Sequence, residues 1–181
     1  MIYEKRTQLA NGRELILRSA TGADAAELLD IFLKTHEETD YLLSYADEST
    51  LTVEGEAAFL KGKETSDNEV EILAIVDGKF VGCAGINSCG SKYKVKHRAD
   101  FGISVLKEYW GMGIGTRLTE ACIECAKQAG YEQVELQVVA DNERAVSTYN
   151  KLGFTEFGRD PRGFKSRLTG YQELVYMRLE L

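Results

Sequence analysis

The first part of the chain joins a strand pattern to two helical patterns. Residues 14–19 read as a strand. From residue 21 to residue 33, capping residues lead into apolar positions at helical spacing, and a weaker helical pattern covers about residues 53–63. The chain is therefore expected to begin with a strand that leads into a helical layer.

A hairpin is predicted after this helical region. Two β-rich runs, at 70–76 and 79–86, are separated by Asp77-Gly78, the dipeptide that best fits the left-handed positions of a tight two-residue turn. We therefore predict that the two runs pair as antiparallel strands. A further strand is expected at 99–105, after a polar, basic loop.

The second half of the chain reads as strand and helix units. A glycine-rich turn leads into a long helix that is apolar on one side and is closed by Gly130. Beyond it the pattern predicts a strand at 134–139, a short helix at 142–152, and strands at 154–157 and 171–179. This order predicts an α/β (α+β) fold with a mixed, mostly antiparallel central sheet flanked by helices. Residues 1–181 show no repeat or linker and are expected to form a single domain.

Charge and composition narrow the possible partners and cofactors. The net charge of −7 and the isoelectric point near 5.0 argue against nucleic acid, because phosphate binding needs a concentrated basic face. Between residues 24 and 69 there are thirteen acidic residues and three basic ones, which is either a solvated face or an attraction for a cationic substrate. No apolar stretch is long enough for a bilayer, so we expect no membrane partner and a cytoplasmic location. No cluster has metal-ligand spacing, so no metal is expected, and the four cysteines are expected to be free thiols.

The glycine-rich turn is the most informative segment. Glycines alternate at 111, 113 and 115, so backbone N–H groups can approach an anion closely while the helix N-terminus adds partial positive charge. A P-loop NTPase is disfavoured because no lysine precedes Thr116. A nicotinamide enzyme is kept as an alternative, although Thr116 stands where its third glycine belongs. A plain tight turn is the third interpretation.

Two motifs together carry a resemblance to a known family. The strand 103–105 with the loop 109–115, and Asp141-Asn-Glu-Arg running into a segment that ends Leu152-Gly-Phe154, are similar to the GNAT superfamily of N-acetyltransferases. The resemblance covers about residues 14–179 in element order, and its motif-rich part is 99–157. It implies the GNAT-like form of the predicted fold and acetyl-coenzyme A (acetyl-CoA) as cosubstrate.

The resemblance also implies where the cosubstrate binds. The pantetheine arm is expected along the backbone of Ile103, Ser104 and Val105. The pyrophosphate is expected on backbone N–H groups of the loop formed by Gly111, Met112, Gly113, Ile114, Gly115 and Thr116. Asn142 matches a position whose side chain commonly contacts the arm. Trp110 departs from the Arg or Gln usual in the family, which changes one side-chain contact.

Acetyl transfer to an amine needs an acid for the leaving thiolate and an acceptor for the ammonium proton. Tyr149 matches the tyrosine that commonly supplies the proton, although a core tyrosine is the simpler interpretation of the residue taken alone. Some relatives place a glutamate at the position of Gln137, so this chain departs from the pattern. Asp100 and Glu135 are the candidate bases instead, with ordinary surface carboxylates as the competing interpretation.

The acceptor side is implied to come from the first two helices and their connection. This places Glu37, Glu38, Asp40, Tyr41 and Tyr45 near the amine. The expected function is transfer of an acetyl group from acetyl-CoA to a primary amine of a small molecule or peptide. A CoA-binding sensor without turnover and a nicotinamide oxidoreductase are the alternatives. Homodimers are common in the family, which leaves a homodimer open here.

Overall fold

The computed structural model describes residues 1–181 as one eight-stranded sheet with four helices. The strands are β1 (Glu4–Gln8), β2 (Glu14–Ser19), β3 (Val70–Val76), β4 (Lys79–Ser88), β5 (Arg98–Val105), β6 (Gln133–Val139), β7 (Thr155–Ser166) and β8 (Gly170–Glu180). The helices are α1 (Ala25–Glu38), α2 (Val53–Thr65), α3 (Ile114–Gln128) and α4 (Glu143–Lys151). Short 3₁₀ turns lie at Gly22–Asp24, Ala46–Glu48 and Lys107–Tyr109.

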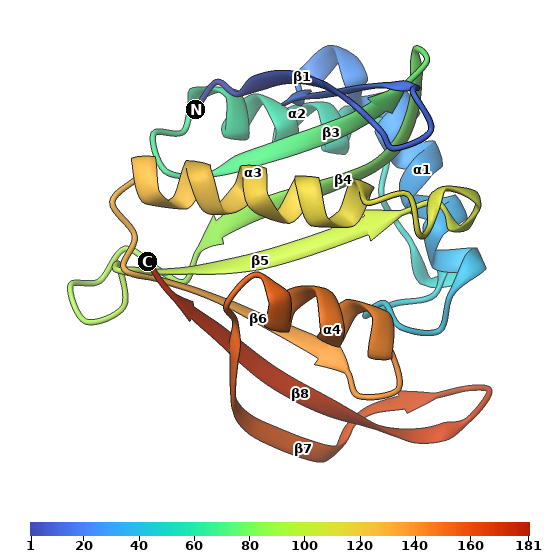
Figure 1. The fold of residues 1–181 in the computed structure, drawn as a ribbon, viewed down its shortest axis with the longest axis vertical. Coiled ribbons are helices and arrows are strands. Elements are labelled where there is room, and N and C mark those ends of the chain that lie inside the picture. Colours follow the sequence, from blue (N-terminus) through green and yellow to red (C-terminus); the bar gives the residue numbers. More distant parts are fainter.

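The sheet runs in the order β1-β2-β3-β4-β5-β6-β8-β7, and β5–β6 is its only parallel pair. The predicted mixed, mostly antiparallel sheet is therefore confirmed. In Figure 1, α3 and α4 lie on the near face of the sheet and α1 and α2 on the far face. The hairpin at Asp77-Gly78 is confirmed as well, because both residues have positive φ (49° and 78°).

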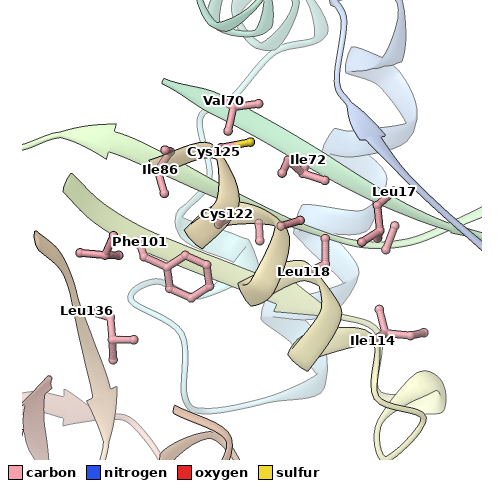
Figure 2. Close-up of a cluster of buried hydrophobic side chains, with 14 of the residues drawn as sticks. Leu17, Val70, Ile72, Ile86, Phe101, Ile114, Leu118, Cys122, Cys125 and Leu136 are labelled. Atoms are coloured by element: carbon pink, nitrogen blue, oxygen red, sulfur yellow. The ribbon is translucent and has the colours of Figure 1, made fainter. Parts of the chain in front are cut away.

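The larger core lies between the sheet and α3. Figure 2 shows Ile114, Leu118, Cys122 and Cys125 of α3 packed toward β2, β3, β4 and β5. Cys122 and Cys125 are buried free thiols, so the helix uses them as small apolar residues. A smaller core on the opposite face includes Leu28 of α1, Leu60 of α2 and Leu73 of β3. Both faces of the sheet are thus anchored around its central strands.

The two parallel strands, β5 and β6, separate after their first three residue pairs. β5 pairs with β6 only at Arg98–Asp100, which faces Gln133–Glu135, although both strands continue beyond these residues. The remaining part of β5, from Phe101 to Val105, is bonded to β4 alone. The divergence opens the middle of the sheet at the carboxyl ends of β5 and β6.

Candidate active site

The open edge of β5 presents backbone groups to the gap. The Leu106 N–H donates a hydrogen bond to the Val81 carbonyl (2.9 Å), so the N–H groups of every second residue before it, such as Ser104 and Gly102, also point toward β4. Because the bonding direction alternates along a strand, the N–H groups of Ile103 and Val105 point toward β6, which does not pair there. These are free donors for an extended ligand. The Val105 carbonyl accepts a hydrogen bond from Trp110 Nε1 (2.7 Å).

The glycine loop forms the end of this gap. Gly111 and Gly113 both have a φ of 80°, and an added Cβ at either position would meet no atom within 4 Å. Gly113 is the N-cap of α3, so the first N–H groups of that helix face the same space. The loop is a cradle that fits a phosphate group.

One cavity of about 800 Å³ connects these features. Its lining includes most of the residues expected to hold the cosubstrate, namely Ile103, Ser104, Val105, Gly111, Gly113, Ile114, Gly115, Thr116 and Asn142. Met112 does not line it and packs instead against the core. Asp100, Tyr149 and Tyr41 line the same cavity, so the structure brings them together with the cradle.

Tyr149 reaches the cavity from α4. Its ring packs edge-on against Phe101 (centroids 6.1 Å apart) and lies 5.7 Å from Phe154. The Tyr149 hydroxyl makes no hydrogen bond within the protein. Since every fully buried polar side-chain atom has a hydrogen-bond partner, this hydroxyl is not fully buried and opens into the cavity that Tyr149 lines. Burial raises the pKa of Tyr149 well above its usual value, which keeps the phenol protonated.

The N-terminus of α4 forms the opposite wall of the gap. Asn142 caps this helix by accepting a hydrogen bond from the Ala145 N–H (3.3 Å), which leaves its side-chain NH₂ free to donate. The Arg144 guanidinium lies over the Trp110 ring, 5.4 Å from the centroid, and both residues line the cavity. Trp110 therefore links the glycine loop to α4. Arg144 ends the Asp141-Asn-Glu-Arg motif, yet only the fold places its charge beside the cavity.

The two candidate bases have different surroundings. Asp100 lines the cavity, and burial, followed by repulsion from Glu135, raises its pKa. Glu135 does not line the cavity and instead binds Arg98 (3.0 Å) and Arg178 (3.1 Å). These partners lower its pKa despite partial burial. The Glu135 carboxylate is therefore held in an ion-pair network outside the cavity, and Asp100 is the candidate base at the cavity wall.

The acceptor side differs from the expectation in two further residues. Glu37 is exposed at the end of α1 and does not line the cavity. Glu38 also lies outside the lining, and its carboxylate accepts a hydrogen bond from the Lys107 N–H (2.6 Å). The lining on this side comes instead from Thr35, Thr39, Tyr41, Leu42, Leu43, Phe164 and Leu174. This side of the cavity is therefore lined by apolar and hydroxyl groups, and Asp100 belongs to the same lining.

Three of the thirteen acidic residues of the run pair with arginines from elsewhere in the fold. Arg18 binds Asp24 (2.7 Å), and Arg167 binds Asp47 (2.8 Å) and Glu48 (3.0 Å). The Arg167 pairs lie at the surface and add little stability, whereas the Arg18–Asp24 pair is partly buried. These two arginines offset only part of the negative charge of the run.

Asp40 fastens the connection between α1 and α2 to the β7–β8 hairpin. Its carboxylate accepts hydrogen bonds from Ser166 Oγ (2.6 Å), Tyr45 Oη (2.8 Å) and Gln172 Nε2 (3.1 Å). Ser166 and Gln172 are buried, so removing the acceptor leaves buried donors unsatisfied. This contact holds the segment that carries Tyr41.

We expect Asp40→Ala to lower stability by about 1–3 kcal/mol, because buried donors lose their partner, and to loosen the segment that carries Tyr41. Chemical denaturation and hydrogen exchange of that segment measure the two effects. Asp30→Ala is the control, since Asp30 pairs with Lys34 on the exposed face of α1. Equal effects of both substitutions would contradict the role given to Asp40.

The fold and the cavity define a class of protein. A gap between splayed strands, with backbone donors along one edge and an anion cradle at its end, fits an extended ligand that carries phosphate groups. Residues 26–154 match the family model described as Acetyltransferase (GNAT) family. The chain belongs to the GNAT acetyltransferase family.

Curated relatives and solved structures agree with this assignment. The chain is 31% identical over 108 residues to the L-amino acid N-acetyltransferase AaaT of Escherichia coli, covering 59% of this chain and 65% of AaaT. The match to N-alpha-acetyltransferase 30 of Schizosaccharomyces pombe spans 49% of that protein. The chain thus matches less than two thirds of the length of both curated relatives. None of the helices is long and apolar enough to cross a membrane.

Two solved structures share the fold. The acetyltransferase of GNAT family from Streptococcus pneumoniae has a TM-score of 0.88 at 32% identity, covering 92% of this chain and 99% of that one. A phosphinothricin acetyltransferase from Sinorhizobium meliloti, solved in complex with acetyl-CoA, has a TM-score of 0.80 at 16% identity, covering 91% and 87%. The second likeness is one of fold alone.

Proposed function

We propose that this protein transfers an acetyl group from acetyl-CoA to a primary amine of a small molecule or peptide. The observation that carries the proposal is the single cavity in which the glycine cradle, the open edge of β5 and Tyr149 meet. Solved GNAT relatives with bound acetyl-CoA support the choice of cosubstrate. The N–H groups of Ile103 and Val105 would bind the pantetheine arm, and the loop from Gly111 to Thr116 the pyrophosphate.

In this proposal Tyr149 is the acid for the departing thiolate. A thiol has a pKa of about 8.5 and a phenol one of about 10, so transfer depends on position rather than acidity. Burial raises the pKa of Tyr149 further. The phenolate left after proton donation is therefore strongly basic and takes up a proton again at once. Phe101 packs against Tyr149 on one face of β5, and Asp100 lies on the other face. From the cavity wall Asp100 offers its carboxylate to the incoming ammonium group.

The alternatives have less support. A nicotinamide fold places the dinucleotide on a parallel sheet, and here β5–β6 is the only parallel pair. A CoA-binding sensor has no need for a phenol that opens toward the cavity, which favours turnover. The acceptor lining is mostly apolar and hydroxylic, so we propose an amine on an apolar body ahead of a polyamine.

The test is release of CoA thiol from acetyl-CoA with a panel of amino acids, peptides with free N-termini, polyamines and aminoglycosides. Amine-dependent release, with the acetylated amine identified by mass spectrometry, is the expected result. Binding of acetyl-CoA without release under any amine would favour the sensor. Stabilisation by NADH but not by acetyl-CoA would overturn the proposal.

A further inference from the structure

A row of three paired residues crosses the sheet beneath α1 and α2. Glu71 of β3 pairs with Gly85 of β4, and Gly85 pairs with Gly102 of β5. The side chain of Glu71 lies on the face of Leu73, which packs against α1 and α2. Gly102 lines the cavity. Since neighbouring strands are about 4.8 Å apart, the row connects Glu71 to the cavity over about 10 Å.

The two glycines leave the row open. The Glu71 carboxylate lies directly over Gly85, because a Cβ added there would collide with Glu71 Oε2. Above Gly102 an added Cβ would meet no atom within 4 Å. The carboxylate thus extends along the row toward the cavity. The remaining distance, about one strand spacing of roughly 5 Å, suits a bridging water molecule.

Glu71 has few polar partners. It forms no salt bridge, whereas the neighbouring Lys63 is engaged by Glu69 (3.0 Å) and the Ile86 carbonyl (3.3 Å). Burial raises the pKa of the Glu71 carboxyl to about 7, although the Cys83 thiol of β4 and Lys63 of α2 lower it. Glu56 of α2 raises it further, and no charged group of α1 contributes.

We propose that Glu71 takes the proton from the acceptor ammonium ion, through water held above Gly102. This inference rests on the proposed acetyl transfer and adds a catalytic base to it. Asp100 lies at the cavity wall and binds the ammonium group. Glu71 lies behind it, across the open row.

The protons and bonds balance in this scheme. The ammonium gives one proton through water to the Glu71 carboxylate, which leaves a neutral amine. The amine nitrogen then attacks the thioester carbon, the new C–N bond forms and the C–S bond breaks. Tyr149 gives its proton to the departing sulfur and regains one from the nitrogen. A base whose pKa is near the working pH performs such a transfer best.

The first experiment compares kcat/KM against pH for wild type, Glu71→Gln and Asp100→Asn with an amine found in the panel. For wild type we expect an acidic limb near pH 7, following the Glu71 carboxyl. In Glu71→Gln we expect that limb to disappear and kcat/KM at pH 7.5 to fall by about 10²-fold, as for loss of a general base. Asp100→Asn is expected to raise KM and keep the limb.

The second experiment blocks the row without touching the carboxyl. Gly102→Ala places a methyl group in the open space above β5, and we expect kcat to fall about tenfold while the affinity for acetyl-CoA is unchanged. Gly158→Ala is the matched control, because Gly158 lies in β7, away from the row, and its Cβ would meet only an ordinary contact at 3.8 Å. Equal kcat values in both variants would overturn the water path.

Stability against pH gives a readout apart from activity. The raised pKa means that ionising Glu71 disfavours the folded state, so wild type should lose stability relative to Glu71→Gln as the pH rises from about 5 to above 7. A constant difference across that range would overturn the proposal, as would an acidic limb kept in Glu71→Gln. If this pH-dependent difference is present but wild type acetylates no amine in the panel, the proposed acetyl transfer fails. The titration of Glu71 would still stand in that case.

Discussion

Tyr149→Phe is expected to lower kcat by about 10²-fold or more while the Kd for acetyl-CoA stays within about twofold, because general acid catalysis typically contributes 10²–10⁴-fold. Phenylalanine keeps the ring that packs against Phe101 and Phe154. The hydroxyl makes no hydrogen bond within the protein, so no buried partner loses a contact. The substitution therefore removes the proton donor and little else.

A leaving group of different basicity sharpens this test. An acetyl thioester of a more acidic thiol needs less help from an acid, so Tyr149→Phe should affect its turnover less than that of acetyl-CoA. Tyr131→Phe is the control, because Tyr131 is buried and its hydroxyl accepts a hydrogen bond from Asn68 (3.0 Å) outside the cavity. Wild-type kcat in Tyr149→Phe with both thioesters would show that the tyrosine only packs.

The elements with an apolar pattern were predictable from the sequence. The hairpin at Asp77-Gly78, the strand before the glycine loop and the helix after it all follow from local rules of turn and periodicity. β1 was missed because its residues, Glu-Lys-Arg-Thr-Gln, form an edge strand with no buried apolar face. β7 was predicted as four residues and runs from Thr155 to Ser166, with register shifts near Glu156 and Asp160 that interrupt the alternation.

The site was predictable where it is built from backbone. The glycine loop and the edge of β5 are contiguous in sequence, and their binding groups are N–H groups present in any residue except proline. Side-chain partners depend on register between strands distant in sequence, which no local pattern gives. Thus Glu135 meets Arg98 and Arg178 only because β6 lies between β5 and β8.

The same limit hid the row that begins at Glu71. In the sequence Glu71 interrupts an otherwise apolar strand, while Gly85 and Gly102 read as ordinary strand glycines. Only the strand pairing shows that the three residues are neighbours, because β4 places Gly85 between Glu71 and Gly102. An acidic residue within an otherwise apolar strand is the only local sign of such a path.

Gly113→Val is expected to weaken acetyl-CoA binding by at least about tenfold, because a left-handed position resists side chains and the cradle loses space. Gly113 has a φ of 80°, and its Cβ would enter the open cavity. Any rotation that relieves the strain turns the first N–H groups of α3 away from the phosphate. Isothermal titration with acetyl-CoA measures the loss.

Gly12→Val separates strain from binding. Gly12 has a φ of 83° in the β1–β2 turn, its Cβ would also meet no atom within 4 Å, and it lies outside the cavity. The backbone cost, roughly 1–2 kcal/mol for a left-handed residue, should therefore lower Tm similarly in both variants, while only Gly113→Val loses affinity. Equal affinities would mean that the pyrophosphate does not rest on this loop, and the cosubstrate would then have to enter the gap in another orientation.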